Sequence, residues 1–375
     1  MSQMSIKSDK LDDQRDRPDL KRFFAHRVRE AILRSKHLKN TSGPRLIGFP
    51  CEHWDACSGM LWGKGALGEL KAKGWDIVLT PPQLELVQRK RLCRSLKPDA
   101  IFFIKARDWK NHPRHYPDIP LIFIIDDADF LDPNERDHVI ACTKAAALVI
   151  AGNEFVASWC RQHNPNVEKI WVPHPTRSSS IITPNAKRKN IILWAPKNPV
   201  GYIQESKFIS DVICKLRESR SDFEFQMTGC ANKAWADSFA EPLLAADVDL
   251  KQFGYFKEYA DYLSILASAA IGIHPVKIEN EYARGKSFGK SLSYISASAV
   301  VVTDPVPDHS DFFRHKSNAM VANTVEEYAE SISYLLDHPA ERQAMAEQAY
   351  TDFLIQLATP VAAKKLEAAI LKAIQ

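Results

Sequence analysis

The sequence has 375 residues, of which 45% are hydrophobic and 26% are charged, and this length is typical of two globular domains. Residues 1–44 hold an excess of lysine and arginine over acidic residues, whereas the rest of the chain is close to neutral. A nearly neutral body, without a basic stripe of interleaved aromatic residues, excludes a nucleic-acid-binding protein.

The seven cysteines and the hydropathy pattern bear on where the protein resides. The cysteines are odd in number and include no Cys-x-x-Cys pair, so we expect reduced side chains in a cytoplasmic protein. The N-terminal residues are charged throughout and show no signal peptide, and no apolar run approaches the length of a membrane span.

Residues 18–38 are predicted to form one helix that starts at Pro18, after a charged segment without apolar periodicity. Leu20, Phe24 and Val28 recur near one face, and arginines and lysines occupy the other. Two interpretations are open. The helix packs on the first domain, or it makes a peripheral contact with the inner face of a membrane.

Residues 45–180 are predicted to form a first domain in which short apolar strands alternate with helices. Short connections between alternating strands and helices are typical of an α/β fold with a doubly wound parallel sheet. The expected strands are 46–49, 76–79, 100–104, 121–125, 147–150 and 169–172, and the expected helices are 60–73, 82–95, 132–145 and 153–163.

The run Gly63-Lys64-Gly65-Ala66-Leu67-Gly68 matches the pattern G-x-G-x-x-G of dinucleotide-binding sites. In such sites the glycines directly follow the first strand, but here residues 50–62 intervene. The second strand also lacks an acidic residue at its end, where Thr80 and two prolines stand. We therefore do not expect a dinucleotide site in this domain.

Three carboxylates, Asp126, Asp127 and Asp129, follow the fourth expected strand. The carboxyl ends of parallel strands are where ligands bind, so a functional role is one interpretation. The other is a capping or turn role for the next segment. Binding of Mg²⁺ by this run is a less favoured hypothesis, and no other metal site is evident.

A linker rich in Ser, Thr, Pro and Asn (176–189) separates the first domain from a second one, predicted for residues 181–355. Its first strand, near 190–194, leads into a loop with Lys197, and a later strand (223–228) ends at Gly229. Further helices are expected at 201–218, 258–266, 324–336 and 339–351, and a last one lies within 356–375.

The stretch 267–304 predicts a βαβ unit. A strand (270–274) is followed by a charged loop, a helix (286–297) and a second strand (299–303). The expected N-terminus of the helix carries Gly285, Lys286 and Ser287, with Lys290 one turn further. Free backbone N–H groups, the helix dipole and two lysines on one face predict a site for a diphosphate.

Residues 286–304, KSFGKSLSYISASAVVVTD, resemble the nucleotide-sugar-binding core of GT-B glycosyltransferases, nearest to the retaining family four (glycosyl transferases group 1). Residues 325–345 are similar to the same family. Two departures stand out. Ser293 replaces the helix glutamate that holds the ribose hydroxyls in the family, and Ser298 and Val300 replace its usual glycine and proline.

This resemblance implies two Rossmann-like domains that face each other across a cleft, with the last helix (356–375) crossing back to the first domain. It implies transfer of a sugar from a nucleotide-diphospho-sugar donor to a glycan, a lipid-linked acceptor or another hydroxyl, with retention of configuration. It implies no required cofactor or metal, since lysines replace the charge of a divalent cation. The glycines at 63–68 would then face the acceptor.

Residue roles follow from the resemblance in the same way. Lys197 is a further candidate for the diphosphate, although it is also a plausible solvated loop lysine. The acidic loop would place Glu279 and Glu281 on sugar hydroxyls, and Asp126 or Asp127 would orient the acceptor or act as a base. The nucleotide would also contact Gly229, Gly285, Lys286, Ser287, Lys290 and Ser293.

Two alternatives remain open from the sequence. A nucleotide-sugar epimerase shares the fold but needs a pair of opposed acid and base carboxylates around the sugar. A catalytically degenerate GT-B subunit that serves as a binding or scaffold protein is favoured by Ser293 in place of the glutamate.

Overall fold

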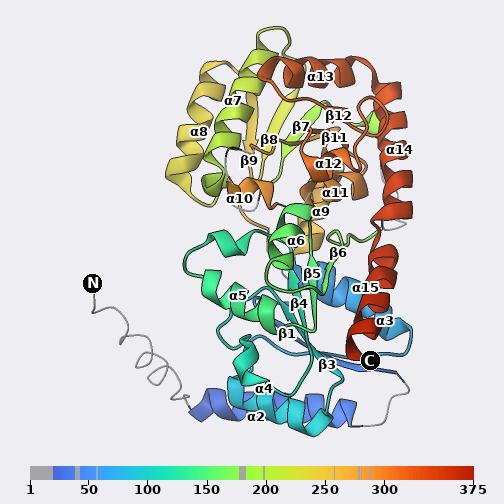
Figure 1. The fold of residues 1–375 in the computed structure, drawn as a ribbon. Helices are drawn as coiled ribbons and strands as arrows, with labels where there is room; N and C mark the ends of the chain where they lie inside the picture. The colour runs from blue at the N-terminus through green and yellow to red at the C-terminus, as the bar shows by residue number, and fades with distance from the viewer. Residues whose placement is uncertain are drawn as a thin grey trace.

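The computed structural model shows two α/β domains stacked on each other, with the helix α2 (Leu20–His37) at the outer end of the first domain (Figure 1). This helix confirms the expectation for residues 18–38. The predicted site residues Lys197 and Ser287 lie outside the described residues. The described residues are 20–38, 43–55, 58–176, 183–196, 199–256, 258–277, 279, 281–286 and 289–375.

The first domain is built on a six-stranded sheet of order β2-β1-β3-β4-β5-β6, in which every pairing is parallel. Its central strands, AIFFI and LIFII, are buried at every position, because helices cover both faces. The last strand comes earlier than predicted. The strands are β1 (Arg45–Pro50), β2 (Asp76–Leu79), β3 (Ala100–Ile104), β4 (Leu121–Ile125), β5 (Leu148–Ala151) and β6 (Val167–Lys169).

The helix predicted for 60–73 is confirmed, and its first half is a π-helix, η1 (Gly59–Ala66). The ring of Trp54 lies against Gly63, where a Cβ would come within 2.4 Å of the indole, so the glycine is needed for packing. The other helices of the first domain are α3 (Leu67–Ala72), η2 (Pro113–His115), α4 (Leu86–Leu96), η3 (Asp129–Leu131), α5 (Arg136–Ala145) and α6 (Glu154–Arg161).

The second domain contains a second parallel six-stranded sheet, of order β12-β11-β10-β7-β8-β9. The strand β12 has two residues, too few for a periodic pattern, and the sequence did not predict it. The strands are β7 (Ile191–Trp194), β8 (Glu224–Met227), β9 (Asp249–Gln252), β10 (Ile271–His274), β11 (Val300–Thr303) and β12 (Met320–Val321).

Of the helix predicted for 286–297, the described residues show α11 from Gly289 to Ser296, and Lys286 itself is not helical. The loop before it contains a short helix, and residues 233–245 form a helix that was not predicted. The helices here are η4 (Asn185–Lys187), η5 (Pro199–Gly201), α7 (Ile203–Arg217), α8 (Lys233–Ala245), α9 (Tyr259–Ser268), α10 (Glu281–Arg284), α11 (Gly289–Ser296), α12 (Pro307–Ser310), α13 (Val325–Asp337) and α14 (Pro339–Gln356).

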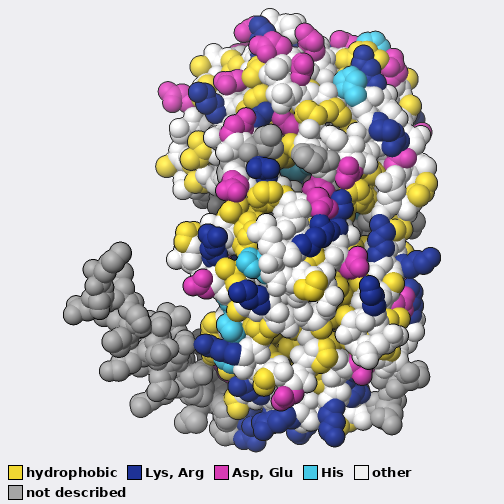
Figure 2. Space-filling view, viewed as in Figure 1, with side chains coloured by type: hydrophobic (Ala, Val, Ile, Leu, Met, Phe, Trp, Pro, Cys, Tyr) yellow, Lys and Arg dark blue, Asp and Glu magenta, His cyan; other side chains and the backbone are white. Residues whose placement is uncertain are grey.

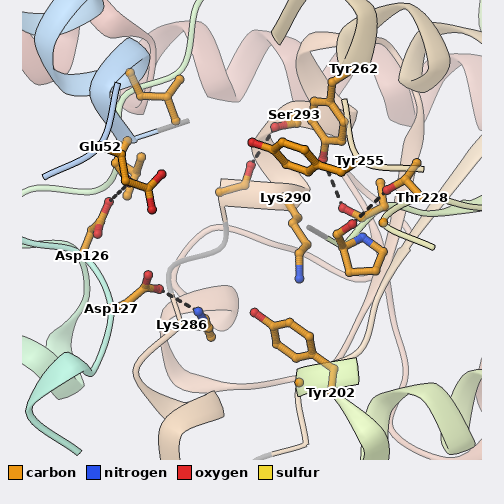
Figure 3. A pocket seen from close by; sticks show the side chains of 18 of the residues that line it. Glu52, Asp126, Asp127, Tyr202, Thr228, Tyr255, Tyr262, Lys286, Lys290 and Ser293 are labelled. Atoms are coloured by element: carbon orange, nitrogen blue, oxygen red, sulfur yellow. Dashed lines mark hydrogen bonds and ion pairs between the residues drawn. The ribbon is translucent and has the colours of Figure 1, made fainter. Parts of the chain in front are cut away.

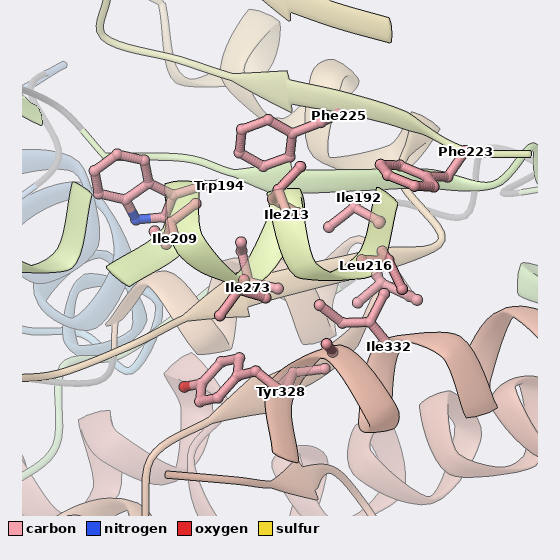
Figure 4. Close-up of a cluster of buried hydrophobic side chains, with 14 of the residues drawn as sticks. Ile192, Trp194, Ile209, Ile213, Leu216, Phe223, Phe225, Ile273, Tyr328 and Ile332 are labelled. Atoms are coloured by element: carbon pink, nitrogen blue, oxygen red, sulfur yellow. The ribbon is translucent and has the colours of Figure 1, made fainter. Parts of the chain in front are cut away.

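One core of the second domain lies between the sheet and the helices α7 and α13 (Figure 4), and a second buried cluster includes residues of β7 and α11. Trp194 and Phe225 come from neighbouring strands, and the two helices contribute Ile213 and Ile332 to the same cluster. Full burial of such a side chain stabilises a fold by about 1.5–3 kcal/mol. This packing holds the carboxyl ends of the strands in fixed positions.

The last helix, α15 (Thr359–Ile374), leaves the second domain and packs on the first (Figure 1). Its buried residues Ala363, Leu366 and Ile370 join the core that contains Trp62 and Leu70. Two facing parallel sheets and a returning C-terminal helix confirm the fold expected from the resemblance. The domain boundaries stay predictions, and the one near residue 180 falls outside the described residues.

Candidate active site in the cleft between the domains

A cavity of about 510 Å³ lies between the carboxyl edges of the two sheets. The side chains of its two walls face each other in Figure 3, with Glu52, Asp126 and Asp127 on one side and Lys286 and Lys290 on the other. Parallel sheets place their ligand sites at this edge. The predicted residues that line the cavity are Asp126, Asp127, Gly229, Lys286, Lys290 and Ser293.

The wall from the first domain is an ion-pair network that follows β3 and β4. Lys105 Nζ lies 3.0 Å from Asp126 Oδ1 and 2.5 Å from Asp127 Oδ2. Asp126 Oδ2 also accepts a hydrogen bond of 3.3 Å from the indole of Trp62. Lys105 has a φ of +62°, a strained backbone for a side chain of this size, which the buried pairs hold in place.

Asp127 connects the two walls, because its Oδ1 lies 3.1 Å from Lys286 Nζ (Figure 3). Burial disfavours the charge of Asp127, but the two lysines outweigh it and hold the pKa of the carboxyl well below its usual value. Burial likewise opposes the charge of Lys286, yet Asp127 raises the pKa of the ammonium above its usual value. The ion pair between Asp127 and Lys286 thus connects the two walls of the cleft.

The wall from the second domain is cationic and aromatic. Lys290 Nζ lies 4.3 Å from the ring centre of Tyr202, and Lys286 Nζ lies 5.8 Å from it. Burial raises the pKa of the Tyr202 hydroxyl, but the two lysines outweigh this and lower it. No carboxylate of the described residues forms an ion pair with Lys290, so its charge is open to an anion in the cleft.

Gly285 lies at a contact between the domains. A Cβ on Gly285 would come within 2.3 Å of the Cβ of Ala128, and its carbonyl accepts a hydrogen bond of 2.7 Å from Asn153 Nδ2. The residue precedes α11 by several positions and is buried against the first domain. Its predicted role at the diphosphate stays a prediction, and the structure adds a packing role.

Ser293 lies inside the cavity but is already engaged by the first domain. Its Oγ donates to the carbonyl of Gly289 (3.0 Å) and lies 3.1 Å from His174 Nε2. Burial lowers the pKa of His174 to about 4, so the imidazole is neutral at pH 7. The backbone carbonyl of His174 also accepts from Thr359 N at the start of α15 (2.9 Å), so His174 joins both domains and the last helix.

Gly229 follows β8 and lines the cavity together with Thr228, Gly254 and Tyr255, and Figure 3 shows Thr228 and Tyr255 away from the carboxylates of the first domain. Thr228 Oγ1 donates to the carbonyl of Pro196, which fixes this corner (2.9 Å). Tyr255 is 47% exposed, and its ring is drawn against the open cavity in Figure 3. A flat ring beside open backbone is suited to a nucleobase.

The structure does not bring two of the predicted carboxylates into the cavity. Glu279 and Glu281 are exposed and are not among the described residues that line it. Their predicted role on sugar hydroxyls stays a prediction. No group of three or more His, Cys, Asp or Glu side chains that could hold a metal ion occurs in the described part of the chain.

Sequence reasoning missed Lys105 and Tyr202. Lys105 directly follows five buried apolar residues, and a lone charge at the carboxyl end of a central strand is the signal that could have found it. Tyr202 has no such signal, because its position between η5 and α7 depends on the course of the loop after β7.

Solved structures with the same arrangement share little sequence with the chain. Sucrose-phosphate synthase from Thermosynechococcus elongatus superposes with a TM-score of 0.67 at 9% identity, over 88% of this chain and 98% of its own. HepE from Anabaena, solved with UDP-glucose, gives 0.64 at 11%, over 88% and 100%. S. aureus TarM gives 0.57 at 13%, over 77% of this chain. These likenesses show the fold.

The family model described as "Glycosyl transferase-like" matches residues 210–361, from α7 to the start of α15. The chain therefore has the two-domain GT-B fold, and its second domain is similar to glycosyl transferases. The resemblance found in the sequence is thereby confirmed, whereas retention of configuration stays a prediction. A search of curated proteins by sequence finds no match to this GT-B protein, and the chain spans 58% of the length of TarM.

Proposed function

We propose that this GT-B protein is a glycosyltransferase that moves a sugar from a UDP-sugar to a hydroxyl acceptor bound against the first domain. The observation that carries the proposal is the pair Lys286 and Lys290 beside Tyr202, facing open space in the cleft. HepE was solved with UDP-glucose, and this supports the choice of UDP as the first nucleotide to test.

The two walls have complementary tasks in such a reaction. The glycosidic bond to the diphosphate breaks, and the leaving oxygen gains negative charge that Lys286 and Lys290 stabilise. The acceptor oxygen forms the new bond to the sugar, and its proton passes to Asp126, one of the two candidate bases. Asp126 and Asp127 stand on the acceptor side, and Asp127, with its low pKa, is suited to orient Lys286 rather than to take that proton.

The test is a thermal-shift titration with UDP, GDP, ADP and dTDP, each with and without Mg²⁺. A nucleotide at a hundred times its dissociation constant raises the free energy of unfolding by about 2.7 kcal/mol. We expect a shift with UDP that is smaller for Lys290→Ala. Hydrogen bonds to charged groups contribute about 1.5–3 kcal/mol, so the dissociation constant should rise about tenfold or more.

Lys290 is the sharper variant because it has no carboxylate partner among the described residues, whereas loss of Lys286 also leaves Asp127 with one cation fewer. The matched control is Lys64→Ala, which removes an exposed lysine paired with Asp55. If none of the nucleotides raises the melting temperature, the cavity is not a nucleotide site. That result would favour the alternative of a catalytically degenerate scaffold protein. Dependence of the shift on Mg²⁺ would show that a metal takes part.

The finer reaction is tested with radiolabelled UDP-sugars. Transfer to a glycan or lipid-linked acceptor supports the proposal, and the anomeric signals of the product decide between retention and inversion. Conversion of the UDP-sugar to a stereoisomer without an acceptor would favour the epimerase alternative.

A lipid-linked acceptor is favoured by the outer face of α2. Val28 and Ile32 are 58% and 49% exposed there, one helical turn apart, and Arg29 and Lys36 flank them. Figure 2 shows lysines and arginines gathered at the base of the first domain, where α2 and α4 lie. None of the described helices is long and apolar enough to cross a membrane.

We propose that this face makes a peripheral contact with an anionic bilayer. Co-sedimentation with vesicles of phosphatidylglycerol and phosphatidylcholine tests it. We expect binding that rises with the phosphatidylglycerol fraction and is weakened by Ile32→Asp. Equal binding to vesicles of pure phosphatidylcholine, or no binding to any of the vesicles, would overturn the proposed membrane contact. The proposed sugar transfer would not be affected by that result.

A further inference from the structure

Glu205 is a carboxylate inside the cleft that neither the ion-pair network nor the predicted site includes. It lies in the first turn of α7 and lines the cavity, and its side chain is only 3% exposed. The positive end of the helix dipole stabilises a negative charge at this position. From the sequence, this position is only part of the helix expected at 201–218.

The two carboxylate oxygens of Glu205 differ in their partners. Oε1 accepts a hydrogen bond of 3.3 Å from the backbone N–H of Lys277, which follows β10. Oε2 is buried and has no hydrogen-bond partner among the described residues. Buried carboxylate oxygens are normally satisfied, so an unsatisfied one in a ligand cavity indicates a donor that arrives with the ligand.

The charge of Glu205 excludes the diphosphate as that partner, because two anions repel. The complement of a carboxylate oxygen is a hydroxyl or an amide N–H. Along the sheet edge the strand order is β10-β7-β8-β9. Thr228, Gly229 and Tyr255 form the nucleobase corner after β8 and β9, whereas Glu205 contacts the segment after β10.

We propose that Glu205 Oε2 accepts a hydrogen bond from a hydroxyl of the transferred sugar and so selects among UDP-sugars. The inference rests on the proposed function, since it requires a UDP-sugar in the cleft. The ribose also carries hydroxyls, and a contact with the ribose instead of the sugar is the outcome that the experiment separates.

The experiment measures dissociation constants of Glu205→Ala and wild type for UDP and for UDP-glucose, UDP-galactose and UDP-N-acetylglucosamine by calorimetry. For the UDP-sugar that wild type binds most tightly, we expect a rise of about tenfold or more, because a charged hydrogen bond is lost. UDP itself should change less than twofold. Glu205→Gln keeps one acceptor oxygen, so its dissociation constant for the UDP-sugar should lie between those of wild type and Glu205→Ala. It replaces Glu205→Ala in the test if that variant does not fold.

Glu326→Ala is the matched control, since Glu326 also lies in the first turn of a helix of the second domain but is exposed. It should leave all constants unchanged. Equal weakening of UDP and UDP-sugar by Glu205→Ala would assign Glu205 to the ribose or to structure and overturn the proposal. No weakening, or a wild type that binds UDP-sugars no tighter than UDP, would overturn it too. A wild type that does not bind UDP at all would instead overturn the proposed function.

Discussion

The two domains have the same parallel six-stranded sheet, yet their strand ends facing the cleft carry opposite chemistry. In the first domain Asp126 and Asp127 directly follow β4 and form ion pairs with Lys105. In the second, the segments after β7 and β10 supply Tyr202, Lys286 and Lys290. The strands of both sheets are mainly apolar and buried, so the segments that follow the strands decide what each wall binds.

A second difference concerns how the charges are satisfied. The carboxylates of the first domain are paired within the protein, whereas Lys290 of the second has no carboxylate partner among the described residues. Ion pairs within the first wall hold its side chains in place, whereas the ammonium group of Lys290 in the second wall can bind an anionic ligand. Substitutions in either wall can therefore test this contrast.

The largest expected effect is on stability and comes from Lys105→Ala. The change leaves the buried Asp126 without its cation and Asp127 with Lys286 alone, and breaking a buried pair costs about 3–5 kcal/mol. Urea unfolding measures it. Lys64→Ala, which breaks an exposed pair with Asp55, should cost about 1 kcal/mol or less. Similar losses for both variants would refute the interpretation that ion pairs hold the first wall in place.

A pH effect follows from His174, which joins the two walls. Burial lowers its pKa from 6.5 to about 4, so the unfolded chain binds a proton more readily than the folded one. The resulting stability is complete above about pH 6.5 and is lost as the pH falls to about 4. The loss amounts to about 3 kcal/mol.

Unfolding curves at pH 7, 6 and 5 test this for wild type and His174→Gln. The variant keeps a hydrogen-bonding group toward Ser293 but cannot titrate, so its stability should depend less on pH. Parallel pH profiles for the two proteins would show that the histidine does not contribute.

Gly285→Ala tests how closely the two walls must approach. The added Cβ would overlap Ala128, and overpacking of this kind costs about 1–3 kcal/mol. Gly68→Ala is the control, because no atom lies within 4 Å of the position of its Cβ. If Gly285→Ala weakens UDP binding but leaves stability intact, the residue belongs to the diphosphate site, as the sequence predicted.

The smallest effect is expected from the exposed acidic loop. Glu281→Ala should change the free energy of unfolding by less than about 0.5 kcal/mol, as is usual at the surface. From its exposure we also expect turnover to change less than twofold. A tenfold loss of turnover in a sugar-transfer assay would instead support the sugar contact that the resemblance implied for Glu279 and Glu281.

The fold was predictable because its signals are local. Apolar runs such as 100–104 and 121–125 are buried on both sides, and their spacing indicates a parallel sheet. The errors arose where length or packing decides. The two-residue strand β12 is too short for a pattern, and the contact of Trp54 with Gly63 in η1 is visible only in the folded structure.

The site was predictable only in part, because strand ends can be located from sequence but partners across a cleft cannot. Asp127 and Lys286 were each selected, yet nothing local indicated that they face each other. Ser293 was recognised as a departure, but its contact with His174 depends on how the two domains meet. The open oxygen of Glu205 is likewise visible only when its surroundings are known.

The return of α15 to the first domain has a consequence for synthesis of the chain. Leu366 and Ile370 complete a core whose other members, such as Trp62 and Leu70, leave the ribosome long before them. The apolar face of the first domain that α15 covers therefore stays exposed until the second domain has been synthesised. Chaperone binding to stalled nascent chains should persist until residue 370 emerges, although the sheet of the first domain ends at residue 169.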